Sequence, residues 1–461
     1  MVDQGRLKEV YSHIDSNFSK YTSDLIKLIE KKGVSAQGLG MEECMMAVRK
    51  LIDDLGFETQ IYPIPNGYPV IFAKSINPNS NDDDSLLLYN HYDVQPVEPL
   101  EEWDTDPFSG VIQDGKLYGR GVADDKGDLV SRISALTSLK EVLGSIPISI
   151  KWVIEGEEEI GSPNFHGFVK DNKSMLNADS CIWEAGDLNP TNRPEFYLGC
   201  KGLLYVEISI TGASSDRHSK YAAILESPTW RLISLIRSLK DEKGKIMIDG
   251  FYDGIIPPSG EEYKLISNIE FDEAANLKFL GAQRYLGDKK GPDLVSAFIN
   301  EPTCNIAGLF SGYLGKGPKM ILPSSATVKI DFRLVPGQEP ETVLILLRRH
   351  LKSNGFSDAG LKVLSSEAPA KTPADSELVL KATEAARKIY HQDPVIWPLM
   401  PATGPMALFR KILDIPVAMV NCVAYVGSSY HSPNEHIYLS HYQKGIEYFA
   451  TLIADYREKP E

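Results

Sequence analysis

Short apolar runs that end in histidine or carboxylate residues constrain the fold of this chain more than any other feature. The run Leu86–Tyr89 is continuous rather than alternating and leads into His91 and Asp93, and the run ISIKWVIEG leads into a group of glutamates. Continuous apolar runs of this kind are typical of strands buried on both faces of a sheet. Between them, the apolar positions of Leu129–Leu143 recur at helical spacing. The order strand, helix, strand predicts an α/β domain with parallel strands.

The middle of the chain has a different pattern. In KGLLYVEISITG apolar and polar residues alternate, which predicts an antiparallel strand with one face in water. We expect a helix over about Thr229–Leu239, then a loop-rich stretch with PPSGEE and GDKKGPD, the strand TVKIDFRLVPG and the helix PETVLILLRRHLKSNG. These elements predict a compact α+β unit.

The end of the chain returns to the first pattern. From about Asp375 we expect a long helix, and the apolar run IPVAMVNC follows it. We therefore predict a protein of the α/β class, with an open and mostly parallel sheet that is flanked by helices and interrupted by an inserted α+β domain. The predicted first domain comprises residues 1–200 and 373–461, and the predicted inserted domain comprises residues 201–372.

The charge balance and the cysteines narrow the function. With 63 acidic against 48 basic residues the net charge is −15, which repels phosphate backbones and anionic lipids, so neither a nucleic acid nor a membrane is an expected partner. The five cysteines form no CxxC pair, which argues against a disulfide framework and a thiolate zinc site.

The N-terminal segment lacks the apolar core of a signal peptide, and no run reaches the ~18 apolar residues of a membrane span. We expect a cytoplasmic protein.

Histidine and carboxylate residues follow several of the apolar runs. His91 and Asp93 are two apart on a strand and face the same way, so the carboxylate can hold the ring of a metal-binding histidine, although a structural role is the alternative. The turn LYGRGVADDKGD places two aspartates at a helix start, where simple caps are the alternative. EGEEEIGS places four glutamates after a buried strand, where a solvated loop is the alternative. The motifs IWEAGD and SSYHSPNEH add Glu184, Asp187 and His431.

Together these groups indicate a hydrolytic metal site. They gather at successive strand ends of one open α/β sheet, which is where such folds bind ligands. Two imidazoles and several carboxylates, without a thiolate, suit Zn²⁺ or a similar divalent ion, whereas histidines are poor calcium ligands. A two-metal hydrolase requires a bridging carboxylate, terminal ligands on each ion and an unligated carboxylate that deprotonates water, and the motifs supply each role.

The order HxD, GRGxxDDKG, EGxEExGS, a further acidic residue and a late histidine resembles the di-zinc metallopeptidase superfamily of carnosinases, cytosolic nonspecific dipeptidases, glutamate carboxypeptidases and acetylornithine and succinyl-diaminopimelate deacylases. The segment EEWDTDPFSGVIQDGKLYGRGVADDKG is most similar to the dipeptidase branch, and DFRLVPGQEPE and YHSPNEHI extend the resemblance over the whole chain. The resemblance implies two divalent metal ions per chain, with zinc as the expected metal and manganese as the alternative.

The resemblance also implies roles for individual residues. Asp93 would support the histidine before it, and Glu158 would be the general base that takes a proton from the metal-bridging water and gives it to the leaving amine. Asp187 is the alternative to Glu184 as the terminal ligand of the first ion. The implied metal ligands are His91, Asp124 and Glu184 for the first ion, and Asp124, Glu159 and His431 for the second.

The same resemblance implies that the inserted domain is a lid through which a homodimer forms. His218 matches the lid histidine that stabilises the tetrahedral oxyanion, either in its own site or in that of the partner subunit. Arg333 matches the arginine that grips the terminal carboxylate of the substrate, with an ordinary salt bridge as the alternative. Thr403, in the loop PATGP, would line the substrate pocket.

The sequence differs from the family pattern in three places, two of which affect the expected substrate. His218-Ser219-Lys220 stands where many relatives have His-Ser-Gly, Glu184 stands where dipeptidase relatives commonly have aspartate, and PATGPM stands where close dipeptidases have a Gly-Gly-Ser type of loop. We predict a metal-dependent hydrolase that cleaves the amide bond of dipeptides or small peptides. The alternative is a metal-dependent deacylase or carboxypeptidase that acts on N-acyl amino acids. A relative that has kept the fold for binding alone is the alternative outside enzymes, and the complete set of implied ligands with Glu158 argues against it.

Overall fold

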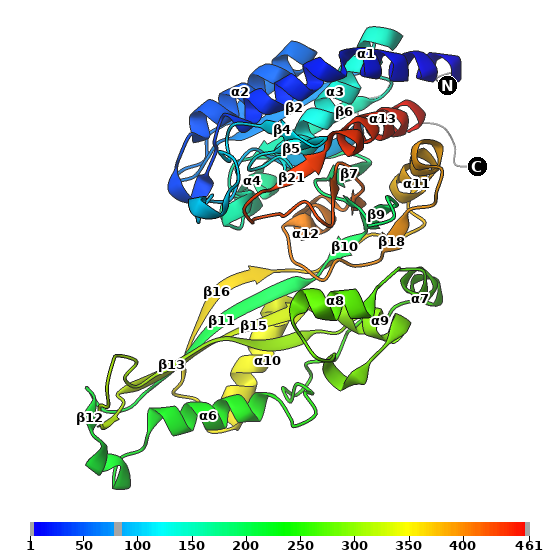
Figure 1. The fold of residues 1–461 in the computed structure, drawn as a ribbon. Helices are drawn as coiled ribbons and strands as arrows, with labels where there is room; N and C mark the ends of the chain where they lie inside the picture. Colours follow the sequence, from blue (N-terminus) through cyan, green and yellow to red (C-terminus); the bar gives the residue numbers. More distant parts are fainter. Residues whose placement is uncertain (1–3, 78–84, 457–461) are drawn as a thin grey trace.

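The computed structural model describes residues 4–77 and 85–456, and its larger part is built around one sheet of 10 strands (Figure 1). Its centre is four parallel strands in the order β6 (Ser149–Glu155), β3 (Ser85–His91), β7 (Ser180–Trp183) and β19 (Val417–Met419). One side continues antiparallel into β2 (Val70–Ser75) and β1 (Glu58–Tyr62). The other side continues through β9 (Pro194–Tyr197), β8 (Asp187–Leu188) and β20 (Ala424–Tyr425), with β18 (Val395–Trp397) beside β9. The predicted α/β class with a mostly parallel central sheet is confirmed.

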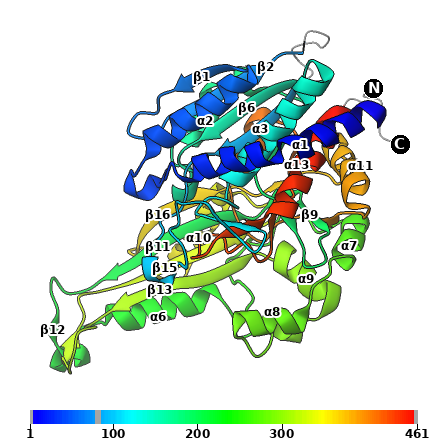
Figure 2. The ribbon, with the colours of Figure 1, turned by 45° about the horizontal axis from the view of Figure 1, so that its top comes forward.

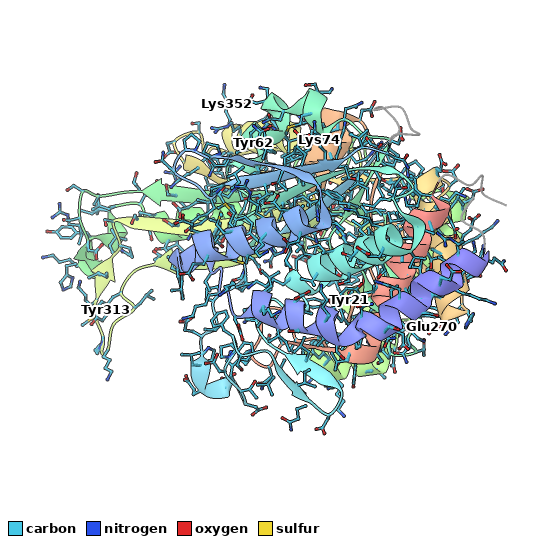
Figure 3. All side chains as sticks on the ribbon, turned by 90° about the horizontal axis from the view of Figure 1, so that it is seen from above. Tyr21, Tyr62, Lys74, Glu270, Tyr313 and Lys352 are labelled. Atoms are coloured by element: carbon cyan, nitrogen blue, oxygen red, sulfur yellow. The ribbon has the colours of Figure 1, made fainter. Side chains whose placement is uncertain are left out.

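Helices cover both faces of this sheet. On one face, α1 (Gln4–Ile29), α2 (Met41–Leu55), α3 (Lys126–Leu143) and α13 (Leu439–Asp455) lie side by side, as Figures 2 and 3 show from two directions. Tyr21, labelled in Figure 3, joins α1 to α3 through a hydrogen bond of 2.8 Å between its hydroxyl and Ser138 Oγ. The other face packs against α4 (Phe165–Asp171) and residues 406–413. Because both faces are buried, the central strands have the continuous apolar pattern of the sequence.

A second, smaller sheet is antiparallel and follows the order β13 (Thr303–Ser311), β15 (Ser325–Leu334), β11 (Gly202–Thr211) and β16 (Gly360–Glu367). The alternate residues Leu204, Val206, Ile208 and Ile210 are buried against α6 (Pro228–Leu239) and α10 (Pro340–Ser353), as the alternation predicted. At the far end, β12 (Arg217–His218) and β14 (Ile321–Leu322) form a two-stranded arm that points away from the large sheet (Figure 1).

The two sheets are joined where the chain leaves and re-enters the larger part. β10 (Gly199–Cys200) pairs with β17 (Ala370–Lys371), so both crossings lie next to each other. β19, which follows the second crossing, lies between β7 and β9 in the large sheet. α11 (Glu377–Tyr390) packs beside α13 on the way back. The chain therefore returns to the first sheet, as the apolar run near its end indicated.

The prediction of a loop-rich stretch after α6 is wrong. It contains α7 (Gly260–Ser267), α8 (Glu273–Leu280) and α9 (Gly291–Asn300). Ser259 and Glu262 form a capping box at the start of α7, and the Asp272 side chain accepts the backbone N–H of Ala275 at the start of α8. These helices are short, and few of their residues are buried, so their apolar spacing was too weak to see between the glycines and prolines.

No helix within residues 4–77 and 85–456 combines the length and the apolar character that a membrane crossing needs. All five cysteines are buried and free.

Candidate metal centre

The carboxyl ends of three neighbouring parallel strands form the floor of the candidate site. β3 ends at His91, β6 ends shortly before Glu158, and β7 ends directly before Glu184. Asp124 comes from the turn that precedes α3, and His431 comes from the loop between β20 and β21 (His436–Tyr438). Five segments that are far apart in the sequence therefore meet at one edge of the sheet, as expected for a ligand site in this class of fold.

The Asp124 carboxylate lies between the two imidazoles. Its Oδ1 is 3.0 Å from His91 Nε2, and its Oδ2 is 3.0 Å from His431 Nε2. The residue after it, Asp125, occupies the N-cap position of α3 without a side-chain cap hydrogen bond. Instead, Asp125 Oδ2 accepts hydrogen bonds from Asn90 Nδ2 at 2.6 Å and from the backbone N–H of His91 at 3.1 Å. The two aspartates are therefore not simple helix caps.

Carboxylates complete two clusters around these histidines. Glu159 Oε2 lies 3.2 Å from His431 Nε2, and Glu184 Oε2 lies 3.6 Å from His91 Nε2. Ligand atoms within 4.8 Å of one another define two potential metal-binding groups: Asp124, Glu159 and His431 in one, and His91, Asp125 and Glu184 in the other. The second group includes Asp125, which was not among the predicted ligands.

A buried oxygen in this region is suited to a metal ion. Glu184 Oε2 is buried and has no hydrogen-bond partner among the described residues, while Oε1 accepts a hydrogen bond from Trp183 Nε1 at 3.2 Å. A buried carboxylate oxygen that is not satisfied by the protein is costly unless a cation or water satisfies it. Its position beside a ring nitrogen of His91 gives the nitrogen and oxygen donor set that divalent zinc or manganese accepts.

Asp93 holds the first histidine and the glutamate loop together. His91 Nδ1, on the side of the ring away from Asp124, lies 3.0 Å from the backbone oxygen of Asp93 and 3.2 Å from its Oδ1. The same carboxylate accepts the backbone N–H groups of Glu158 at 3.2 Å and of Glu159 at 3.1 Å. The first contact was expected from the HxD spacing, whereas the second could not be read from the sequence.

The electrostatics are those of a crowded anionic site. Burial raises the pKa of Glu158 to about 8, and the charges of Asp124 and Glu159 act in the same direction, while His91 opposes them. Burial alone would lower the pKa of His91, but the surrounding carboxylates, Glu184 first, hold it well above its usual value. Hydrogen bonds to Asp124 and Glu159 raise the pKa of His431 to about 10. Like charges this close favour either bound protons or bound cations.

Two of the residues singled out in the sequence, Asp187 and His218, lie outside this cluster. Asp187, the alternative ligand, accepts a hydrogen bond from the hydroxyl of Tyr430 and belongs to neither potential metal group. The distant arm at β12, which Figure 2 shows, carries His218, and this residue is exposed. Its Nδ1 accepts the backbone N–H of Lys220 at 3.1 Å. Within a single chain, His218 therefore does not lie near the clusters around His91 and His431.

Arg333 and Thr403 contact each other at the junction of the two sheets. Arg333 Nη1 donates a hydrogen bond to Thr403 Oγ1 at 2.6 Å. Arg333 also pairs across the sheet with Leu203, just after the chain leaves the large sheet. No carboxylate ion pair to Arg333 is found among residues 4–77 and 85–456, so the alternative of an ordinary salt bridge is not supported.

Two buried charged residues were missed. Arg132 of α3 donates to the backbone oxygens of Tyr89 at 2.7 Å and Trp183 at 2.6 Å, and so ties together the strand ends that precede His91 and Glu184. Glu435 lies within the motif YHSPNEHI, and its carboxylate contacts the turn that carries Asp124. The only sequence signal for Arg132 is that it is a charged residue within an apolar helix. The only sequence signal for Glu435 is that it is close to His431 in the chain.

The α/β fold and the clustered histidines and carboxylates define a metal-dependent hydrolase. Comparison with known proteins agrees: residues 87–455 match the model of "Peptidase family M20/M25/M40". The chain belongs to this peptidase family. The predicted superfamily and the predicted class of metal-dependent peptide hydrolase are thereby confirmed.

Individual relatives resemble the chain over nearly its whole length. The solved structure of an M20 family metallo-carboxypeptidase, Sso-CP2 from Sulfolobus solfataricus, is 36% identical, with a TM-score of 0.88 over 95% of this chain and 99% of the other. The Beta-Ala-His dipeptidase of Rattus norvegicus is 27% identical over 98% of this chain and 96% of its own. The Cys-Gly metallodipeptidase DUG1 of Saccharomyces cerevisiae is 28% identical over 99% of both chains.

Proposed function

We propose that the clusters around His91 and His431 hold two divalent metal ions, zinc first and manganese as the alternative. The observation that carries this proposal is the Asp124 carboxylate, each of whose oxygens lies 3.0 Å from a ring nitrogen of a different histidine. A carboxylate placed in this way is suited to bridge two ions. The proposed terminal ligands are His91 and Glu184 for the first ion, and Glu159 and His431 for the second.

Glu158 is the proposed general base. Its backbone is fixed by Asp93, and its carboxylate lies in the same buried acidic cluster as Asp124 and Glu159. Bound divalent ions lower the pKa of water and polarise a peptide carbonyl. Glu158 then accepts a proton from the attacking water and delivers it to the leaving amine, a step that typically contributes about 10²–10⁴-fold to the rate. Asp93 contributes by keeping the ring of His91 and the glutamate loop in place.

The proposed substrates are dipeptides or small peptides with a free terminal carboxylate. Two of the relatives described above are named as dipeptidases, which supports this class. Arg333 supplies a planar guanidinium that can bind a carboxylate through two hydrogen bonds, and Thr403 fixes its position through the bond of 2.6 Å. A second candidate is a carboxypeptidase or deacylase that acts on N-acyl amino acids. Glu184 in place of aspartate and the likeness to a metallo-carboxypeptidase favour it.

The inserted residues 201–372 form the proposed lid and homodimer domain, and residues 1–200 and 373–461 form the proposed catalytic domain. The adjacent crossings at β10 and β17 support this division. Because His218 is exposed at the far end of the small sheet, we propose that it acts in the site of the partner subunit. We propose a cytoplasmic location, which the five free, buried cysteines support.

Initial rates on paired substrates test the proposed substrate class. Ala–X dipeptides and acetyl–X amino acids with the same residue X present the same scissile bond type and the same terminal carboxylate. They differ in the free amino group and in one carbon of the acyl part. Faster turnover of Ala–X supports the dipeptidase. Faster turnover of acetyl–X would overturn it in favour of the deacylase, and faster turnover of longer peptides trimmed from their C-terminus would favour the carboxypeptidase.

A further inference from the structure

Glu435 is a completely buried carboxylate with a full set of hydrogen-bond donors. Its Oε2 accepts hydrogen bonds from Arg120 Nη1 at 2.7 Å and from the backbone N–H of Gly121 at 3.0 Å. Its Oε1 accepts the backbone N–H groups of Ala123 at 2.8 Å and of Asp124 at 3.1 Å. All four donors therefore come from the one short turn that ends in the proposed bridging aspartate.

This carboxylate extends a connection that begins in the backbone, where β5 (Lys116–Tyr118) pairs with β21 and Gly119 N–H donates to Glu435 O at 3.0 Å. Beyond that point the two loops have no ladder, and the carboxylate joins them. The turn 119–125 precedes α3, and the loop that carries His431 precedes β21. His431 itself has a left-handed backbone with φ of 57°. Asn434, next to Glu435, accepts the backbone N–H of Asp104 at 2.8 Å and donates to Glu102 O at 3.1 Å. The His431 loop is therefore also held by the segment 102–104.

We propose that Glu435 is a positioning residue that sets the distance between Asp124 and His431 and thereby the affinity for the second metal ion. The inference rests on the proposed metal centre. One end of the chain segment 431–435 carries a proposed metal ligand, and the other end holds the backbone N–H of the bridging ligand. A shift of either loop would separate His431 Nε2 from Asp124 Oδ2, which now lie 3.0 Å apart.

The chemistry of the contacts makes a carboxylate necessary at this position. Ionised carboxylates accept several N–H bonds at once, and such charge-assisted bonds are stronger than neutral ones. An amide in the same place would present N–H groups to the backbone N–H groups of Gly121 or of Ala123 and Asp124, because an amide has only one accepting oxygen. The turn would then be pushed away from the His431 loop without a change in side-chain size.

Metal titration of the full-length protein by calorimetry, after chelation and dialysis, tests this role with Zn²⁺ and with Mn²⁺ as the probes. Wild-type protein is expected to bind two ions. Glu435→Gln is expected to bind the second ion about 10–100-fold more weakly, the range typical of lost outer contacts to metal ligands. Because the loss is one of affinity, kcat is expected to recover as the metal concentration is raised, which a purely structural defect would not do.

Two control variants separate positioning from general damage. Arg120→Met removes the ion pair but leaves three backbone N–H groups on the carboxylate, so it is expected to weaken metal binding less than Glu435→Gln. Asp455→Asn removes a different buried carboxylate that accepts a bond from Lys388 at 2.8 Å on the far side of the fold, and it is expected to keep wild-type metal affinity. If Glu435→Gln does not fold, Glu435→Asp replaces it as the test. This variant keeps the charge but withdraws it by one methylene, and it is expected to bind the second ion more weakly, with kcat restored by excess metal.

The outcomes are distinguishable from failure of the proposed function. Wild-type protein that binds no ion would overturn the metal centre itself. Wild-type protein that binds two ions, together with Glu435→Gln of unchanged affinity, would overturn the role of Glu435 alone. Equal losses in Arg120→Met and Glu435→Gln would also overturn it, because the ion pair and not the turn contacts would then set the affinity.

Discussion

The carboxylate of Asp93 accepts the backbone N–H of Glu158, with 3.2 Å between Oδ1 and the nitrogen. This contact joins the end of β3 to the glutamate-rich loop after β6. Since the same oxygen lies 3.2 Å from His91 Nδ1, one side chain orients both a proposed metal ligand and the proposed general base. The HxD motif therefore has a second purpose beyond the support of its own histidine.

Replacement of Asp93 is expected to affect metal binding and catalysis together. Asp93→Asn keeps the size of the side chain but places an amide opposite the backbone N–H groups of Glu158 and Glu159. We expect about 10–100-fold weaker metal binding, as for other outer contacts of ligating histidines. We also expect a lower kcat that excess metal restores only in part, because Glu158 is displaced as well. Asp331→Asn in the small sheet, where Asp331 accepts a bond from Asn305, is the matched control, and a full recovery of kcat with metal would contradict the second role.

Replacement of Arg333 is expected to weaken the binding of substrates with a free terminal carboxylate. Arg333→Lys keeps the charge but loses the planar fork, and a bond to a charged group contributes about 1.5–3 kcal/mol, or roughly 10–100-fold in kcat/KM. Thr403→Val removes the hydroxyl that accepts the Arg333 bond and is expected to have a smaller effect in the same direction. Steady-state kinetics on a dipeptide and on its C-terminal amide give the readout.

The matched control for this prediction is Arg231→Lys. Arg231 pairs with Asp358 on the outer side of the small sheet. Its replacement by lysine is expected to leave kcat/KM unchanged. An equal loss on the amide and on the free acid in Arg333→Lys would contradict a carboxylate-binding role.

The position of His218 predicts complementation between two inactive variants. Glu158→Gln lacks the proposed base and His218→Ala lacks the lid histidine, so each alone is expected to lose most of its activity. If His218 acts in the site of the partner subunit, a mixed dimer contains one intact site. Equal mixing with subunit exchange should then restore about a quarter of the wild-type activity, because half of the dimers are mixed and each has one active site of two. Activity that stays at the level of the separate variants would contradict action across the dimer.

Metal binding is expected to release protons at pH 7. Without bound ions, hydrogen bonds to Asp124 and Glu159 raise the pKa of His431 to about 10, and burial raises the pKa of Glu158 to about 8, so both groups carry a proton at pH 7. A metal ligand must be deprotonated, and nearby cations favour the ionised carboxylate. The apparent metal affinity should therefore rise between pH 6 and pH 8. Calorimetric titration in buffers of different ionisation enthalpy measures the released protons, and proton uptake would contradict the prediction.

Much of the large sheet could be predicted because its strands are buried on both faces. The apolar runs at β3 and β6 are nearly continuous, which is the pattern of strands buried on both faces. The motifs that contain His91 and Glu158 come at or just after the ends of these runs. The helices α7, α8 and α9 could not be predicted in the same way. They are stabilised by local caps such as Ser259 and by a few buried residues, which leave little periodic signal.

The candidate site was predictable where chemistry and spacing coincide, and less so where the contacts are between distant segments. The motifs indicated which histidines and carboxylates to consider, and the resemblance to the metallopeptidase superfamily implied the individual ligands. The structure brings these ligands together: His91, Asp124, Glu159, Glu184 and His431. The sequence could not show that Glu435 holds the turn before Asp124, since 311 positions separate the two residues. Nor could it show that His218 lies on an exposed arm, because that depends on the length and direction of β11 and β15.

The central claim is that the protein is a peptide hydrolase that depends on two metal ions. The most direct test measures metal content by mass spectrometry on the purified protein, with Ala–X hydrolysis before and after chelation. We expect about two zinc or manganese ions per chain, loss of hydrolysis on chelation and its return when metal is restored, as for other two-metal hydrolases. Glu158→Gln should retain the ions and lose about 10²–10⁴-fold in kcat. Protein that binds no metal and shows no metal-restored turnover of dipeptides or acyl amino acids would contradict the claim.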